Sequence, residues 1–170
     1  MRMYKPKSLM IDKYHILKPE YYKYSDVNRY KGSIRHVYNI HSMVESIYLS
    51  NNLKTQYEYN NNFIYDCVIR SIFDLNIIKD IKFENYDMNK LNIEANSNPE
   101  KECTDYFAFG SSKIMNIYSD IYNHTAGIFN TETDIYPEKI FKVYILNNNI
   151  KENLLYNITG DDLKFKDSML

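Results

Sequence analysis

Apolar residues dominate residues 61 to 78, and four of the polar side chains within this stretch recur at every fourth position. Those polar residues are Asn62, Asp66, Arg70 and Asp74. In a helix, positions four apart lie on one face, so these side chains form a single narrow stripe. A helix with so narrow a polar stripe is expected to be buried. We therefore predict a central scaffold helix over residues 61–78, with Ile72 in the core.

Capping signals and helical spacing of apolar residues predict two further helices. Ser42 and Glu45 form a capping box at the start of residues 42–51. In residues 111–122 the isoleucines recur at helical spacing, so that they share one face. Both segments are amphipathic, and we expect each to dock through its apolar face.

Strands are predicted where apolar and polar residues alternate, or where a short apolar run is bounded by turn residues. The predicted strands span residues 34–40, 80–84, 105–109, 139–146 and 154–158. Residues 86–104 contain Asn-Ser-Asn-Pro and are typical of a surface excursion. Helices and strands in mixed order favour an α+β fold, with about three helices packed on a small mixed or antiparallel sheet.

The composition fits a single domain over residues 1–170. Hydrophobic residues make up 44% and charged residues 25% of the chain, as in soluble globular proteins. No apolar run approaches the roughly 20 residues that a membrane span needs, and no secretory signal is recognisable at the N-terminus. Cys67 and Cys103 are the only cysteines. A disulfide framework is therefore not indicated, and we expect a cytoplasmic protein.

Positive charge and tyrosine are concentrated near the N-terminus. Residues 1–35 hold nine Lys and Arg against three Asp and Glu, a net charge of +6, whereas the whole chain carries −1. Such asymmetry indicates a basic arm that meets an acidic surface, either its own domain's or a partner's. Nucleic acid is the alternative, with lysines on phosphates and tyrosines stacked on bases. The candidate partner-binding residues of the arm are Tyr21, Tyr22, Tyr24, Arg29 and Tyr30.

Spacings typical of metal or nucleotide sites do not occur in the sequence. The four histidines are scattered, and there is no H-x-x-x-H or C-x-x-C, so we predict no metal site. There is no glycine-rich loop either. The strand-to-helix junction at Gly110-Ser111-Ser112 suits an anion at a helix N-terminus or a simple N-cap. Cys103, in a predicted polar loop, is expected to be an ordinary surface thiol.

The order of three segments resembles the core of ADP-ribosyltransferases. The segments are an Arg-His strand followed by a helix, an aromatic strand that ends in two serines before a Tyr-bearing helix, and a late strand after Tyr-Pro. They correspond to residues 35–47, 106–118 and 140–146. In that family the first strand offers His or Arg to NAD and the aromatic-serine segment stacks the nicotinamide. An acid on a later strand stabilises the oxocarbenium-like transition state.

The resemblance implies NAD as a cofactor. The implied contacts are His36, Tyr106, Ser111 and Tyr118. The implied acid would be Glu132, Glu152 or Asp161.

Three functions are therefore considered. The first is a partner-binding protein without catalysis or cofactor, such as an inhibitor or immunity-type protein that occludes a toxin or enzyme. Tyrosine supports this hypothesis, because it gives large contact area and a hydroxyl at little entropy cost. The second is an ADP-ribosyltransferase-like toxin or effector, and the third is a nucleic-acid-binding accessory protein. The first is preferred, because each enzyme hypothesis lacks its decisive residue.

Overall fold

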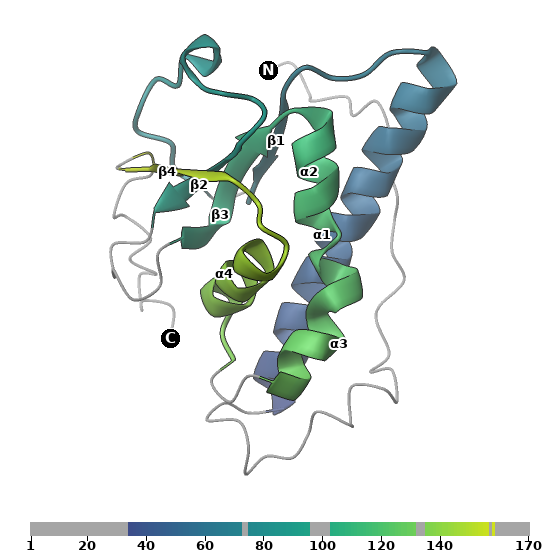
Figure 1. Ribbon diagram of the computed structural model, residues 1–170, viewed down its shortest axis with the longest axis vertical. Coiled ribbons are helices and arrows are strands. Elements are labelled where there is room, and N and C mark those ends of the chain that lie inside the picture. The colour runs from purple at the N-terminus through teal and green to yellow at the C-terminus, as the bar shows by residue number, and fades with distance from the viewer. Residues whose placement is uncertain (1–33, 73–74, 96–102, 132–134, 157, 159–170) are drawn as a thin grey trace, which may run out of the picture.

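Helices and strands lie on two sides of the molecule in the computed structural model (Figure 1). The structure describes residues 34–72, 75–95, 103–131, 135–156 and 158. In chain order the elements are α1 (Ile34–Asn61), β1 (Val68–Ser71), a 3-10 turn η2 (Phe83–Asn85), β2 (Leu91–Ala95), β3 (Cys103–Gly110), α2 (Ser112–Ser119), α3 (Ile121–Thr131), α4 (Pro137–Asn147) and β4 (Glu152–Leu155). The predicted α+β class is confirmed for these residues.

The strands form one mixed sheet in the order β1-β3-β2-β4. β1 and β2 both pair with β3 in antiparallel fashion, and β4 pairs with β2 in parallel. The parallel pair needs a long crossover connection, which β3 and the three helices α2 to α4 supply. Among the described residues, β1 and β4 are therefore the two edges of the sheet.

Each face of the sheet has its own hydrophobic cluster. The larger cluster joins the helices to the strands, with Ile93 and Ala108 fully buried beneath Tyr118, whose ring stacks on Phe141 at 5.1 Å. On the opposite face Phe109 packs in a smaller cluster. Its ring meets those of Phe83 and Tyr86 edge to face, at centroid distances of 5.0 and 5.2 Å. The chain between β1 and β2 thus covers the face that the helices leave open.

The predicted central helix over residues 61–78 is wrong. The 28-residue helix α1 instead ends at Asn61, and Asn62 takes a left-handed φ of 54°, which Asn tolerates better than most residues. Residues 68–71 then pair with β3. Val68, Ile69 and Ile72 are β-branched and favour a pleated strand. The polar stripe at every fourth position did not indicate a helix, because pairing with β3 determines the local structure.

Two predicted strands are helical. Residues 34–40 join the predicted helix 42–51 in α1, where Val37, Ile40, Val44 and Ile47 are buried at helical spacing. Residues 139–146 belong to α4, which begins with Pro137 at its first turn, a position where the missing N–H of proline costs nothing. The buried apolar residues of α4 follow helical spacing and not alternation. They are Ile140, Phe141, Tyr144 and Ile145.

Of the other predicted elements, some are confirmed and some are wrong. The strand at 105–109 is confirmed as β3, and the helix at 111–122 as α2 with the start of α3. The strand at 80–84 is wrong, because that segment is a loop leading into η2. The excursion at 86–104 is wrong in part, since β2 lies within it. The predicted strand at 154–158 overlaps only the end of β4.

No described helix is long and apolar enough to cross a bilayer. Most of the predicted basic arm, residues 1–33, lies outside the described residues.

Candidate functional site

A cavity of about 700 Å³ lies between α1 and the edge strand β1, with α2 as its floor. Helix α1 contributes side chains at positions 43, 46, 47, 50, 51 and 54, which share one face of a helix. All of residues 68–72 line the opposite wall. Met115 and Ser119 of α2 close the bottom, where both are buried. We call this feature the α1–β1 groove.

The register of β1 decides which of its peptide groups face the groove. The N–H of Ile72 donates to the carbonyl of Tyr106 at 3.2 Å. In an antiparallel pair only alternate residues exchange hydrogen bonds, so the peptide groups of Arg70 face β3, whereas those of Ile69 and Ser71 point away from it. Within the described part of the chain, no strand pairs with this edge. Ile69 is 49% exposed there.

A buried polar network closes one end of the groove and ties α1 to α2. Lys54 Nζ lies 3.2 Å from Glu58 Oε2 and donates to Asn116 Oδ1 at 2.7 Å. It also donates to the hydroxyl of Ser112, which in turn donates to Glu58 at 3.0 Å. The other oxygen of Glu58 accepts the backbone N–H of Tyr65 at 2.9 Å. Every charge in this network therefore has a partner.

The Glu58 carboxylate is stabilised in its charged form. Burial alone raises the pKa of Glu58, but hydrogen bonds from Tyr65, Ser112 and Lys54, together with the charge of Lys54, bring its pKa below the ordinary value. This carboxylate also explains the Gly110-Ser111-Ser112 junction, since an anion from the protein itself already contacts Ser112 near the helix N-terminus. Ser111 acts as the N-cap of α2, its hydroxyl accepting from the N–H of Ile114 at 3.4 Å.

Arg70 differs from Lys54 in that one nitrogen of its guanidinium group is left without a hydrogen bond to the described residues. Its Nη1 is buried, yet it makes no hydrogen bond within the part of the chain that the structure describes. The nearby Tyr118 hydroxyl is buried in the same way and likewise makes none to a described residue. Burial raises the pKa of Tyr118 well above its usual range, the charge of Arg70 acts in the opposite direction, and the nearby charge of Asp105 raises the pKa further. Arg70 thus brings a positive charge, with unused hydrogen-bonding capacity, to the wall of the groove.

Two potential nucleophiles, Ser112 and Cys103, are poorly accessible. Ser112 is 2% exposed and Cys103 1% exposed. The prediction of Cys103 as a surface thiol in a loop is wrong, because it is the first residue of β3. Cys67, predicted on a buried helix, precedes β1 and is half-buried, and burial raises the pKa of its thiol. The two cysteines do not form a disulfide with each other. No cluster of potential metal ligands occurs among the described residues.

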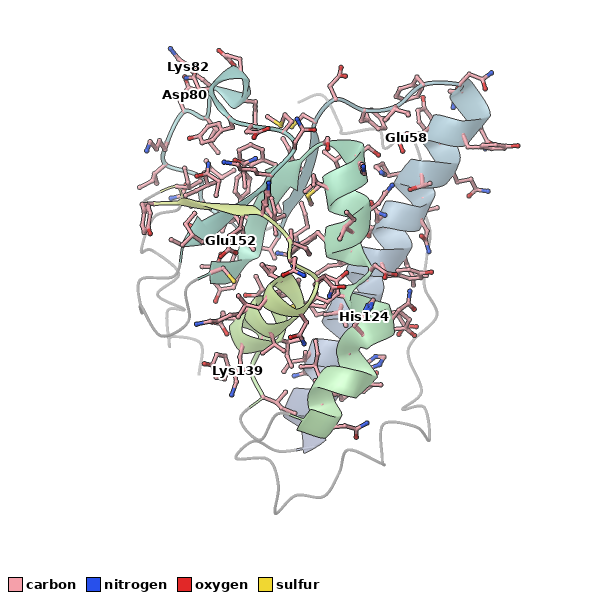
Figure 2. All side chains as sticks on the ribbon, in the orientation of Figure 1. Glu58, Asp80, Lys82, His124, Lys139 and Glu152 are labelled. Carbon is pink, nitrogen blue, oxygen red and sulfur yellow. The ribbon has the colours of Figure 1, made fainter. Side chains whose placement is uncertain are left out.

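The residues implied by the resemblance to ADP-ribosyltransferases lie on several elements. Tyr118 is fully buried in α2, and neither it nor Ser111 or half-buried Tyr106 lines the groove. Glu152 lies on β4, at the sheet edge opposite β1, and far from Glu58 in Figure 2.

Other predicted site residues cannot be placed. His36 lies in the first turn of α1, and the structure does not describe its side chain. Glu132 and Asp161 lie outside the described residues, as do the predicted partner-binding residues Tyr21, Tyr22, Tyr24, Arg29 and Tyr30.

Lys54 and Arg70 were missed as functional residues. Arg70 was assigned to the polar stripe of a helix, although the β-branched residues around it signal a strand. Lys54 could not be recognised from sequence, because its partner Ser112 is 58 residues away.

Comparison of the chain with protein-family models, with curated proteins and with solved structures found no match.

Proposed function

We propose that this protein binds a partner protein without catalysing a reaction, and that the α1–β1 groove receives an extended segment of that partner. The segment would add to β1 as a further strand of the sheet. The observation that carries this proposal is the outward direction of the peptide groups of Ile69 and Ser71, which follows from the hydrogen bond between Ile72 and Tyr106 at 3.2 Å.

The groove supplies both parts of this recognition mode. In strand addition, hydrogen bonds to an open sheet edge give affinity, while pockets for alternate side chains give specificity. Here the open edge is β1, and the apolar side chains of Met43, Ile47 and Met115 line the adjacent groove. Its volume of about 700 Å³ is sufficient for several side chains. An unprotected edge strand is otherwise a liability for aggregation, which a partner would remove.

Burial of Ser112 and Cys103 supports a role in binding. Ser112 has its hydroxyl committed to Glu58 and Lys54, and Cys103 lies in the core. An inhibitor or immunity-type role, in which the groove holds a segment of a toxin or enzyme, is consistent with such a surface. Free thiols at Cys67 and Cys103 are consistent with a cytoplasmic location for this role.

Selection of displayed random peptides on the purified full chain tests the proposal. We expect the selected peptides to bind in extended conformation, with dissociation constants measurable by fluorescence anisotropy. Ser71→Pro removes an N–H that points away from β3, so the edge strand can accommodate it. This variant should weaken binding at least about tenfold, since it deletes a hydrogen bond and places a ring at the open edge.

The matched control is Ser71→Ala, which loses the same hydroxyl but keeps the N–H. It should bind as the unmodified protein does. Failure to select any peptide would contradict the proposed function. Equal binding by the Pro and Ala variants, both shown to be folded by circular dichroism, would contradict strand addition at β1.

A further inference from the structure

The geometry points to an acidic segment as the occupant of the α1–β1 groove: we infer that an Asp or Glu side chain, in the middle of the partner's extended segment, pairs with Arg70. This inference rests on the proposed function and specifies the chemistry of the partner. It follows from the charges that line the groove, from the register of β1 and from the charge of the alternative occupants.

Cationic side chains line the groove without a described acidic side chain beside them, and the nearest carboxyl indicated on the Arg70 side is that of buried Asp105 in β3, whose charge acts with that of Arg70 on the Tyr118 hydroxyl. Lys54 and Arg70 line the groove, and the described lining residues include no Asp or Glu. Lys54 already pairs with Glu58 at 3.2 Å. Arg70 Nη1 has no hydrogen-bond partner among the described residues. A buried guanidinium donor without a partner is costly, and a carboxylate matches its planar geometry better than any neutral group does. Because Nη1 is buried where it stands, the guanidinium would turn towards the groove to pair with a bound carboxylate.

The register predicts a sequence pattern for the segment. Arg70 pairs with Ala108, which belongs to the cluster beneath the helices, so its side chain lies on the helix-covered face of the sheet. On a strand added beside β1, side chains alternate between the two faces. On the added strand, an acidic residue next to Arg70 would point towards the helices. The residues two positions before and after it would point the same way and would lie beside Val68 and Ile72. Those two residues should be apolar, giving the pattern apolar-x-acidic-x-apolar.

The groove runs along all of residues 68–72, and Arg70 lies at the middle of that range. An internal carboxylate fits this position, because a chain terminus would leave half of the open edge unpaired. The segment is therefore expected to pass through the groove and to present the carboxylate from a side chain.

Charge disfavours two other occupants of the open edge. Residues 1–35 of the chain itself carry a net charge of +6, which would be repelled by Arg70. A second copy pairing through its own β1 in antiparallel register would bring two Arg70 side chains together. Like charges directly opposite each other destabilise a strand pair. An acidic partner avoids both repulsions.

A defined peptide pair provides the test on the full chain. The probes are short peptides of alternating Val and Thr, acetylated and amidated, with either Glu or Gln at a central valine position. Fluorescence anisotropy at low salt should show the Glu peptide binding about tenfold or more tightly than the Gln peptide, the ratio expected for a charge-assisted hydrogen bond. The corresponding Lys peptide should bind more weakly than either. Arg70→Met should abolish the preference for Glu over Gln.

Each outcome bears on the inference. If the Glu and Gln peptides both bind the unmodified protein equally, or if the Lys peptide binds most tightly, the acidic specificity is refuted while the proposed function stands. If none of the peptides binds, both the inference and the strand addition it rests on are overturned. Tighter binding by a synthetic peptide of residues 1–33, or a dimer in sedimentation equilibrium that Ser71→Pro dissociates, would replace the acidic partner with the chain itself.

Discussion

The N–H of Ile72 donates to the carbonyl of Tyr106 at 3.2 Å. Together with the register of β1 on β3, this bond shows in which direction each peptide group of β1 points. A slip of the register by one residue would turn the peptide groups of Arg70 towards the groove and reverse the faces of all β1 side chains. The open edge and the position of the Arg70 guanidinium are therefore consequences of one pairing. The experiments below test the packing that supports it.

Ile72→Ala should cost about 1 kcal/mol of unfolding free energy, since Ile72 is only half-buried at the rim of the groove. The matched variant Ile93→Ala, at a position with 0% exposure in β2, should cost about 2–5 kcal/mol. Urea unfolding measures both. Equal costs would indicate that residue 72 lies in the core, as the helix predicted from sequence requires.

Lys54→Met should lower the unfolding free energy by about 3 kcal/mol, because it leaves the Glu58 carboxylate buried without its cation. The control Lys113→Met changes an exposed lysine of α2 and should shift stability by less than about 0.5 kcal/mol. The double variant Lys54→Met, Glu58→Met should be less destabilised than the sum of the two single changes. Strict additivity would contradict an energetic coupling between the pair.

Acidic pH should lower the unfolding free energy by protonating Glu58. Its pKa in the folded protein is lowered from the ordinary 4.5, so its contribution to stability is present above pH 4.5 and is lost as the pH falls through the lower, folded-state value. The difference in unfolding free energy between the unmodified protein and Glu58→Gln should therefore narrow on going from pH 7 to pH 3. A difference that stays constant over this range would contradict the stabilised carboxylate.

Tyr118→Phe and Tyr144→Phe should have opposite effects. The Tyr118 hydroxyl is buried without a hydrogen bond to a described residue, so its removal should be neutral or raise the unfolding free energy by about 1 kcal/mol. Tyr144 donates to the carbonyl of Ile117 at 2.6 Å, and its loss should cost about 1 kcal/mol. Thermal unfolding at neutral pH distinguishes the two. Destabilisation by both changes would show that the Tyr118 hydroxyl has a partner.

Alkaline pH should lower the unfolding free energy through Tyr144. Burial, together with the nearby charge of Asp120, raises the pKa of Tyr144 to about 12 from an ordinary 10.0. Its hydroxyl therefore supports the fold fully below pH 10 and loses that contribution as the pH rises towards 12, because the unfolded chain releases its proton first. Stability measured between pH 9 and pH 11 should fall less steeply in Tyr144→Phe than in the unmodified protein. An identical slope would argue against the raised pKa.

The sequence predicted the fold class and those elements whose signals are local. The aromatic run of β3 and the Ser111 cap of α2 were recognised because their determinants lie within a few residues. Residues 61–78 and 139–146 were misassigned because short apolar runs suit a helix or a strand equally well, and tertiary pairing chooses between them. The long β2–β4 parallel crossover has no local signal at all.

The groove could not be predicted, because its walls come from segments separated in sequence. Lys54 lines one wall from α1, and Arg70 lines the other from a strand that had been read as part of a helix. Only the pairing of β1 with β3 reveals that this edge is open. The composition indicated residues 1–35 as the binding region instead. The positive charge of these residues disfavours their binding in the groove beside Arg70.

Residue-resolved amide hydrogen exchange tests strand addition most directly. In the free protein we predict fast exchange at Ile69 and Ser71, whose N–H groups point away from β3, and slower exchange at Arg70 and Ile72. On addition of the Glu-containing peptide, exchange at Ile69 and Ser71 should slow markedly while that at Arg70 and Ile72 changes little. Binding of the peptide with unchanged exchange at Ile69 and Ser71 would contradict the account.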